Sequence, residues 1–163
     1  MSEKQRASSA VFDTDQAITF QISVLSNLIA RPFYSVVGRH AGISLNDWRL
    51  MLVIASHPGL SQSEIVYATG FNKSNVSRQL NSLGKYVRLE PHPNDNRKQA
   101  VYLTDAGWDI YHQSIPALQW RQKLLTQSLP NADLVQFQKT LTKLISAARD
   151  WSATQETTAP PEH

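Results

Sequence analysis

The segment SQSEIVYATGFNKSNVSRQLNSL, residues 61–83, has the pattern of two short helices joined by a tight turn. Ser61 and Glu64 are the two ends of a capping box, in which the serine hydroxyl accepts a hydrogen bond from a backbone amide and the glutamate accepts one in return. Gly70 is expected to end the first helix, and Asn72 to cap a second helix that reaches the end of the segment. This pattern predicts a helix-turn-helix.

The second of these helices would place its N-terminal residues in the major groove of double-stranded DNA. Its inward side is apolar, with Val76, Leu80 and Leu83, so the opposite side presents hydroxyls, amides and a guanidinium. Such groups match base edges, because an amide pairs with adenine and an arginine forks onto guanine. An ordinary solvated helix face is the alternative interpretation. The residues expected to contact DNA from this unit are Ser61, Lys73, Ser74, Asn75, Ser77, Arg78 and Gln79.

Two short strands with a turn-rich tip between them are predicted next, at residues 87–90 and 99–103. The tip ends in Asp95-Asn96-Arg97-Lys98, which would place cations beside the second helix, where an arginine can enter the minor groove. We expect Asp95 to fold back onto Arg97, to hold the wing tip in shape and orient the guanidinium. Further DNA contacts are expected at Arg88, Asn96, Arg97 and Lys98.

Positive charge is concentrated in this same stretch of the chain. Residues 71–98 carry six Lys and Arg against two Asp and Glu, a net charge of +4, whereas the whole chain carries +3, so the remainder carries −1. This segregation favours DNA as a partner. It argues against a helical-bundle enzyme or a non-enzymatic small-molecule carrier, for which a local concentration of positive charge has no use.

Both flanks of this lobe are predicted to be helical. The N-terminal flank has apolar residues at three- and four-residue spacing from Ile18 onward, and Pro32 should bend that helix. The C-terminal flank contains a helix that begins at Thr104 and is bent by Pro116, then a last amphipathic helix from about Pro130. The apolar faces of these helices have to be covered, either within one chain or by a second copy.

Five blocks of sequence, in this order, resemble the MarR family of bacterial transcriptional regulators. They are LNDWRL (45–50), LSQSEI (60–65), SNVSR (74–78), Asp95-x-Arg97 and LTDAG (103–107), and the resemblance extends over about residues 20–151. It implies a winged helix-turn-helix homodimer in which the helices from both chain ends intertwine. The link from Leu83 to Val87 is shorter than is usual in the family, which leaves the start of the first strand and the orientation of Arg88 open.

The fold predicted is therefore mainly α with a small β-wing, in which helices from both chain ends form the dimerisation region. Five parts are expected: a disordered N-terminus (1–14), a dimerisation helix (15–43), a winged helix-turn-helix DNA-binding lobe (44–103), dimerisation helices (104–151) and a disordered tail (152–163). A dimer would hold its two recognition helices about one DNA turn apart, which matches a palindromic operator.

The resemblance also implies a small-molecule effector, because family members often release DNA when a small aromatic carboxylate binds near the hinge of the lobe. An arginine would pair with such a carboxylate, while aromatic side chains would stack on its ring. The candidates are Arg31, Tyr34, His40, Trp48 and Arg49. As the alternative, these are ordinary core residues and ion-pair partners.

Composition disfavours several other kinds of site. The chain has no cysteine, which excludes disulfides, cysteine nucleophiles and thiolate metal sites. The five histidines show no metal-binding spacing and no Gly-rich phosphate loop is present, so we expect no metal, no cofactor and no enzymatic activity. Without a signal segment or a membrane-length apolar run, a cytoplasmic protein is expected. The function predicted is a repressor released by its effector, with an activator without effector as the alternative.

Overall fold

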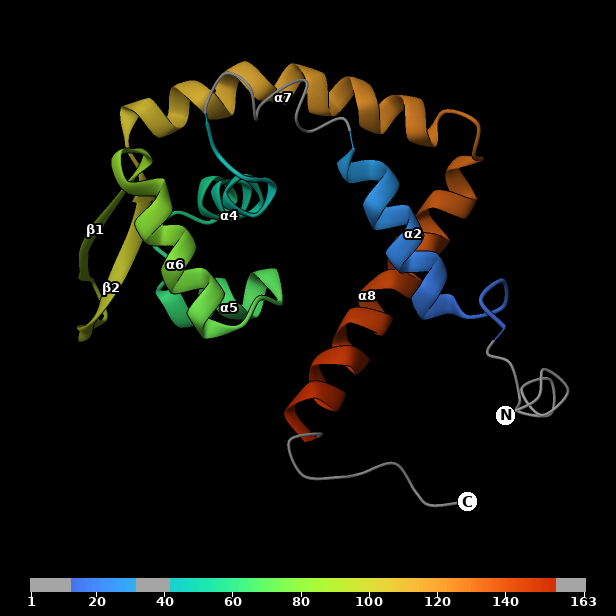
Figure 1. The fold of residues 1–163 in the computed structure, drawn as a ribbon, viewed down its shortest axis with the longest axis horizontal. Coiled ribbons are helices and arrows are strands. Elements are labelled where there is room, and N and C mark those ends of the chain that lie inside the picture. Colours follow the sequence, from blue (N-terminus) through green and yellow to red (C-terminus); the bar gives the residue numbers. More distant parts are fainter. Residues whose placement is uncertain (1–12, 32–41, 155–163) are drawn as a thin grey trace, which may run out of the picture. The chain divides into compact units, whose positions relative to one another are not determined.

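The computed structural model of the chain describes residues 13–31 and 42–154. The chain forms two compact units, Met1–Leu45 and Asn46–His163. Helix α2 (Ile18–Ala30) belongs to the first unit, whereas the helices and strands from Asn46 onward belong to the second (Figure 1). The prediction of a mainly helical protein with one small antiparallel wing is confirmed.

Helix α2 contains no buried residue, although it is rich in apolar side chains. Its large hydrophobic residues are 37–58% exposed, from Leu25 to Ile18. The helix ends at Ala30, and the bend predicted at Pro32 lies outside the described residues, as does the N-terminal segment 1–12. An apolar helix without a covered face within its own unit needs a partner surface.

The core of the second unit is formed by α4 (Leu45–Ser56), α5 (Gln62–Thr69), α6 (Lys73–Leu83) and strand β2 (Asp95–Leu103). Helix α4 begins directly after Ser44 and ends before His57. The buried apolar side chains of this core are Trp48, Leu50, Met51, Ile54, Ile65, Val76, Leu83, Ala100, Val101 and Leu103. They recur at helical spacing on α4 and α6, which is why these helices pack into one lobe.

The predicted helix-turn-helix is confirmed in α5 and α6. Ser61 Oγ accepts a hydrogen bond from Glu64 N at 3.4 Å, and Ser61 N donates to Glu64 Oε2 at 2.7 Å, so the capping box is closed. Gly70 ends α5 with φ of +70°, in the left-handed region that suits glycine. Asn72 Oδ1 accepts from the backbone amide of Asn75 at 2.8 Å and caps α6.

The wing is a hairpin of β1 (Val87–His92) and β2, paired antiparallel with Val87 opposite Leu103 and His92 opposite Asp95. Both strands are longer than predicted, and the turn is only Pro93-Asn94. The first strand continues past residue 90 and includes Pro91, which has no backbone N–H to donate. This is possible because β1 is an edge strand and its register with β2 is irregular next to Pro91. On its other side β2 pairs with residues 59–61, through Val101 N to Leu60 O at 2.9 Å.

The shortened link between α6 and the wing is a single turn of 3₁₀ helix, η2 (Gly84–Tyr86). It brings the first strand to Val87, the residue predicted for its start. Thr104 fastens this turn, because its hydroxyl donates to Lys85 O at 2.7 Å and its amide donates to Tyr86 O at 3.1 Å. The same hydroxyl accepts from Gly107 N at 3.2 Å and so caps the next helix.

That next helix is α7 (Asp105–Thr126), which contains Pro116 without ending there, and it is followed by α8 (Asn131–Thr154). Helix α8 extends three residues past the predicted boundary at Trp151, and the tail from residue 155 lies outside the described residues. Among residues 131–152 no side chain is buried. The exposed large apolar side chains of this region are Trp120, Leu124, Leu125, Leu129, Val135, Phe137, Leu144, Ile145 and Trp151.

Candidate nucleic-acid interface

The N-terminal half of α6 presents a polar face to solvent. Four of the predicted DNA contacts are exposed there, Asn75 is half-buried, and Asn75 Oδ1 accepts a hydrogen bond from the Arg78 guanidinium. The exposed four are Lys73, Ser74, Ser77 and Arg78. The face therefore combines hydroxyl, amide and guanidinium groups within two helical turns, and these are the groups that read base edges.

Two residues predicted to contact DNA are not available for it. Gln79 is only 8% exposed, because it lies three residues after Val76 and four before Leu83 and so falls on the inward face of α6. Ser61 is 2% exposed, and its hydroxyl donates to Glu64 Oε2 at 2.6 Å within the capping box. Both predictions are corrected, since residue type suggested contact with DNA whereas helical phase and capping bury the side chains.

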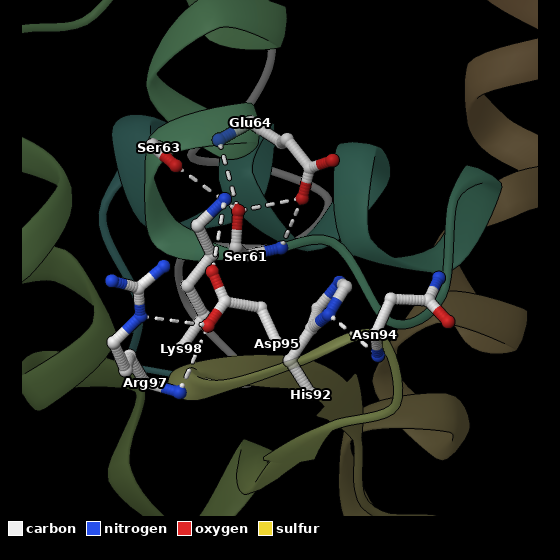
Figure 2. A network of polar contacts seen from close by, with 8 residues as sticks. All are labelled: Ser61, Ser63, Glu64, His92, Asn94, Asp95, Arg97 and Lys98. Carbon is white, nitrogen blue, oxygen red and sulfur yellow. Dashed lines mark hydrogen bonds and ion pairs between the residues drawn. The ribbon is translucent and has the colours of Figure 1, made fainter.

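The wing tip carries Arg97, whose side chain is more exposed than those of Arg88 and Lys98. The side chain of Arg97 is 92% exposed, whereas that of Asp95 is 25% exposed. Asp95 Oδ1 accepts from Arg97 N at 3.1 Å and from Arg97 Nε at 3.3 Å, so the contact predicted between them is present (Figure 2). The exposed Asn96 lies between them. Asp95 therefore holds both the backbone and the side chain of Arg97.

The Asp95 carboxyl has a pKa below its usual value of 3.8. The backbone amide of Arg97 is the main cause, followed by the Arg97 side chain, and the charges of Lys98 and His92 add to it. Hydrogen bonds and nearby cations favour the ionised form of a carboxyl group. The carboxylate is thus charged at neutral pH and available as an acceptor for both groups of Arg97.

Arg88 has a defined orientation on β1, which the sequence left open. Its guanidinium pairs with the Glu90 carboxylate and lies over the Tyr102 ring, 4.6 Å from the ring centroid. Tyr102 is directly opposite Arg88 in the strand register, so cross-strand pairing accounts for this stacking. With 48% of its side chain exposed, Arg88 adds a partly neutralised cation to the wing surface.

The structure describes three of the five residues predicted for an effector, and these three belong to different units. Tyr34 and His40 lie outside the described residues, and Arg31 is an exposed residue of the first unit. Trp48 and Arg49 belong to α4 of the second unit, where Trp48 is 2% exposed and Arg49 is half-buried.

An aromatic cluster on α7 lies next to Trp48 through Tyr111, and the sequence pattern did not predict it. The Tyr111 ring lies 6.3 Å from Trp48 and 5.4 Å from Trp108, and Trp108 stacks on His112 at 5.5 Å. The three α7 residues are spaced i, i+3 and i+4, which places them on one face of the helix. That spacing was the available signal, but their proximity to Trp48 depends on tertiary packing.

Within residues 13–31 and 42–154, no cluster of three or more His, Asp or Glu side chains could hold a metal ion. In the same part of the chain, no helix combines the length and apolar character needed to cross a membrane.

Residues 41–98 match the model of the MarR family. A curated relative, a putative transcriptional regulatory protein for the hcr operon of Thauera aromatica, is 30% identical over 80 residues. That segment is 47% of this chain and 48% of the relative, so the match spans about half the length of the curated relative.

Solved structures match over most of their length. A MarR/EmrR family transcriptional regulator from Acinetobacter sp. ADP1 has a TM-score of 0.76 and 27% identity, covering 85% of this chain and 99% of that one. PcaV from Streptomyces coelicolor, in complex with its natural ligand, has a TM-score of 0.71 and 16% identity, with coverages of 86% and 99%. A cysteine-to-serine mutant of MarR from E. coli, complexed with operator DNA, has a TM-score of 0.69 and 20% identity, and the match covers 83% of this chain and 99% of that one. The last two similarities show the fold alone.

Proposed function

We propose that this chain is a MarR-family transcriptional regulator that binds double-stranded DNA as a homodimer and represses transcription until a small-molecule effector releases it. One observation carries the proposal: the polar face of α6 and the 92% exposed Arg97 belong to one lobe. The segment that contains both, residues 71–98, has a net charge of +4. A groove-reading helix beside a cationic wing is the arrangement that a winged helix-turn-helix uses on DNA.

The homodimer is supported by the apolar side chains that stay exposed on α2, α7 and α8. Phe137 is 52% exposed, Trp120 60% and Trp151 60%, and such large exposed aromatics mark an interaction surface. Joining two copies through these helices would pair two recognition helices, and a palindromic operator has the matching symmetry.

For the effector we propose a small aromatic carboxylate, with Arg31, Tyr34, His40, Trp48 and Arg49 as the candidate contacts. The aromatic cluster of Trp48, Trp108 and Tyr111 supports this proposal, because aromatic rings stack on one another. PcaV, which shares the fold, binds a ligand of its own. An activator without effector would have the same DNA-binding lobe. In such a protein the cluster of Trp48, Trp108 and Tyr111 would serve only as part of the packed core.

The DNA-binding proposal is tested with Arg97→Ala and with the matched control Lys139→Ala, an exposed cation on α8. Binding to a mixed-sequence duplex is measured by fluorescence anisotropy at several salt concentrations. Arg97→Ala should lower the slope of log K against log salt by about 0.9, the value for one phosphate contact. Lys139→Ala should leave the slope unchanged. Equal slopes for wild type and Arg97→Ala would contradict the role of the wing.

The reading role of α6 is tested by operator selection from a random DNA library. Arg78→Ala should lose preference for guanine at one position of each half-site, at a cost of about 1–3 kcal/mol against the wild-type operator. Recovery of the same motif by both proteins would exclude Arg78 as a base contact.

The effector proposal is tested by a melting-temperature screen of aromatic acids, followed by displacement of operator DNA. Acids that raise the melting temperature should also displace the operator, because they favour one state of the protein. Failure of the whole panel in both assays would reject the effector and favour the activator.

A further inference from the structure

We propose that Lys98 is a positioning residue of the wing and not a phosphate contact: its ammonium joins the wing carboxylate of Asp95 to the first turn of α5, and this sets the pose in which Arg97 meets DNA. The inference rests on the proposed function, because it takes Arg97 as a DNA contact. It changes the role expected of Lys98 from its charge alone.

Lys98 and Arg97 are consecutive on β2 but extend in different directions. Successive side chains of a strand leave it on opposite faces, and the two cations approach different oxygens of Asp95: Arg97 Nε is 3.3 Å from Oδ1 and Lys98 Nζ is 3.8 Å from Oδ2. The side chain of Lys98 is 51% exposed, against 92% for Arg97. Figure 2 shows the Lys98 side chain reaching toward Ser61, Ser63 and the first turn of α5, whereas the Arg97 guanidinium extends away from it.

The ammonium of Lys98 is paired with the wing carboxylate of Asp95 and lies beside the first turn of α5 (Figure 2). Its Nζ is 3.8 Å from Asp95 Oδ2 of the wing. On the side of α5, the pKa of Glu64 is lowered mainly by the hydrogen bonds from the Ser61 hydroxyl and amide, and further by the charges of His92 and Lys98. Both carboxylates are therefore ionised at neutral pH. Because the Lys98 ammonium is paired with a carboxylate of its own wing, it has to give up that contact before it can pair with a phosphate.

The link reaches Arg97 through Asp95. Asp95 Oδ2 is the oxygen near Lys98, and Oδ1 accepts from both the amide and the Nε of Arg97. Without the ammonium, the carboxylate is held only by its two hydrogen bonds from Arg97, so the guanidinium is less ordered before DNA binds. Ordering a rotamer-rich side chain on binding lowers affinity. The root of the wing stays in place, because Val101 N donates to Leu60 O at 2.9 Å.

The two roles differ in a double-mutant cycle. A phosphate contact at Lys98 would lower the salt slope by about 0.9 on its own, whether or not Arg97 is present. A positioning residue acts through Arg97, so its substitution has no effect once Arg97 is gone. Coupling between residues in contact is at least about 0.5 kcal/mol, which corresponds to roughly a twofold difference in affinity.

The experiment uses the full chain with Lys98→Met, Arg97→Ala, the double variant and Lys139→Met as a control for loss of an exposed lysine. Affinity for a mixed-sequence duplex is measured at several salt concentrations. We expect Lys98→Met to weaken binding at least about twofold more in wild type than in Arg97→Ala. Additive losses, each lowering the slope by about 0.9, would overturn the proposal.

A measurement without DNA separates this inference from the proposed function. Hydrogen exchange of the Arg97 amide should be faster in Lys98→Met than in wild type, because that amide donates to Asp95. Lys98→Arg should restore the wild-type rate, and Lys139→Met should not change it. Unchanged exchange in Lys98→Met overturns the positioning role. If exchange responds while no variant affects DNA affinity, the network exists and the DNA-binding proposal fails.

Discussion

Gly107 in the first turn of α7 is a position where a single methyl group should be costly. A Cβ built there would lie 2.3 Å from Tyr86 O, 3.2 Å from Tyr86 C and 3.3 Å from Leu103 Cβ. The nearest atom belongs to the backbone, so no side chain can rotate away. Gly107→Ala therefore requires α7 and η2 to separate by about 1 Å before the contact becomes normal.

The magnitude follows from the contacts that such a shift would break. Thr104 donates to Lys85 O at 2.7 Å and to Tyr86 O at 3.1 Å, and both bonds cross the same junction. Each is worth about 1 kcal/mol, and their combined loss lies within the 1–3 kcal/mol that overpacking costs. Alanine in place of glycine returns up to about 1 kcal/mol of helix propensity. The net expectation is a loss of about 1–2 kcal/mol in unfolding free energy.

Urea denaturation followed by circular dichroism measures this loss. Ala106→Gly is the matched control, because Ala106 is the exposed neighbour in the same helical turn and its substitution tests helix propensity alone. The reasoning is refuted if Gly107→Ala is as stable as wild type or more stable, since propensity would then dominate and the close approach to Tyr86 would not constrain the junction.

Three further expectations concern the lobe. Ser61→Ala should cost about 1 kcal/mol of stability by removing the α5 cap while leaving the salt slope of DNA binding unchanged; a lower slope would restore Ser61 as a DNA contact. Gln79→Met should leave the selected operator unchanged and keep or raise stability by up to about 1 kcal/mol, because the buried Gln79 Oε1 has no hydrogen-bond partner among the described residues; an altered operator motif would contradict its inward position. Acid should destabilise the wing: the pKa of Asp95 lies below 3.8 in the folded protein, so the folded state binds fewer protons than the unfolded chain, and the stability present above that value is lost as the pH falls through the folded pKa. As the pH is lowered through 3.8 and below, the melting temperature of Asp95→Asn should fall less than that of wild type. An equal fall for both proteins would show that the Asp95 carboxylate does not stabilise the wing.

Local signals were sufficient to predict the helix-turn-helix. A capping box, a glycine with positive φ and an asparagine cap each act within a few residues, so their geometry follows from the sequence alone. Gln79 shows where residue type misleads, because its position between Val76 and Leu83 places it on the inward face. Counting helical phase from the buried residues would have given the correct result.

Non-local contacts account for the features that were missed. The strands extend through Pro91 and Asp95, because pairing across the hairpin outweighs the turn preference of both residues. The aromatic cluster around Trp48 needs α4 and α7 to pack together, which no local pattern reports. The role proposed for Lys98 depends on how close β2 lies to the first turn of α5. The sequence does not show this, because residue spacing predicts only that neighbouring side chains of a strand alternate between its two faces.

The junction at η2 explains why one lobe can hold the polar face of α6 and the wing in a fixed relation. Helix α6 ends at Leu83, β1 begins at Val87, and the intervening turn is held to α7 by both hydrogen bonds of Thr104. Gly107 allows this approach, and Trp108 of the aromatic cluster follows it directly. A displacement of the first turn of α7 therefore acts on the recognition helix and the wing together. For this reason Gly107→Ala should lower DNA affinity more than Ser61→Ala at equal loss of stability.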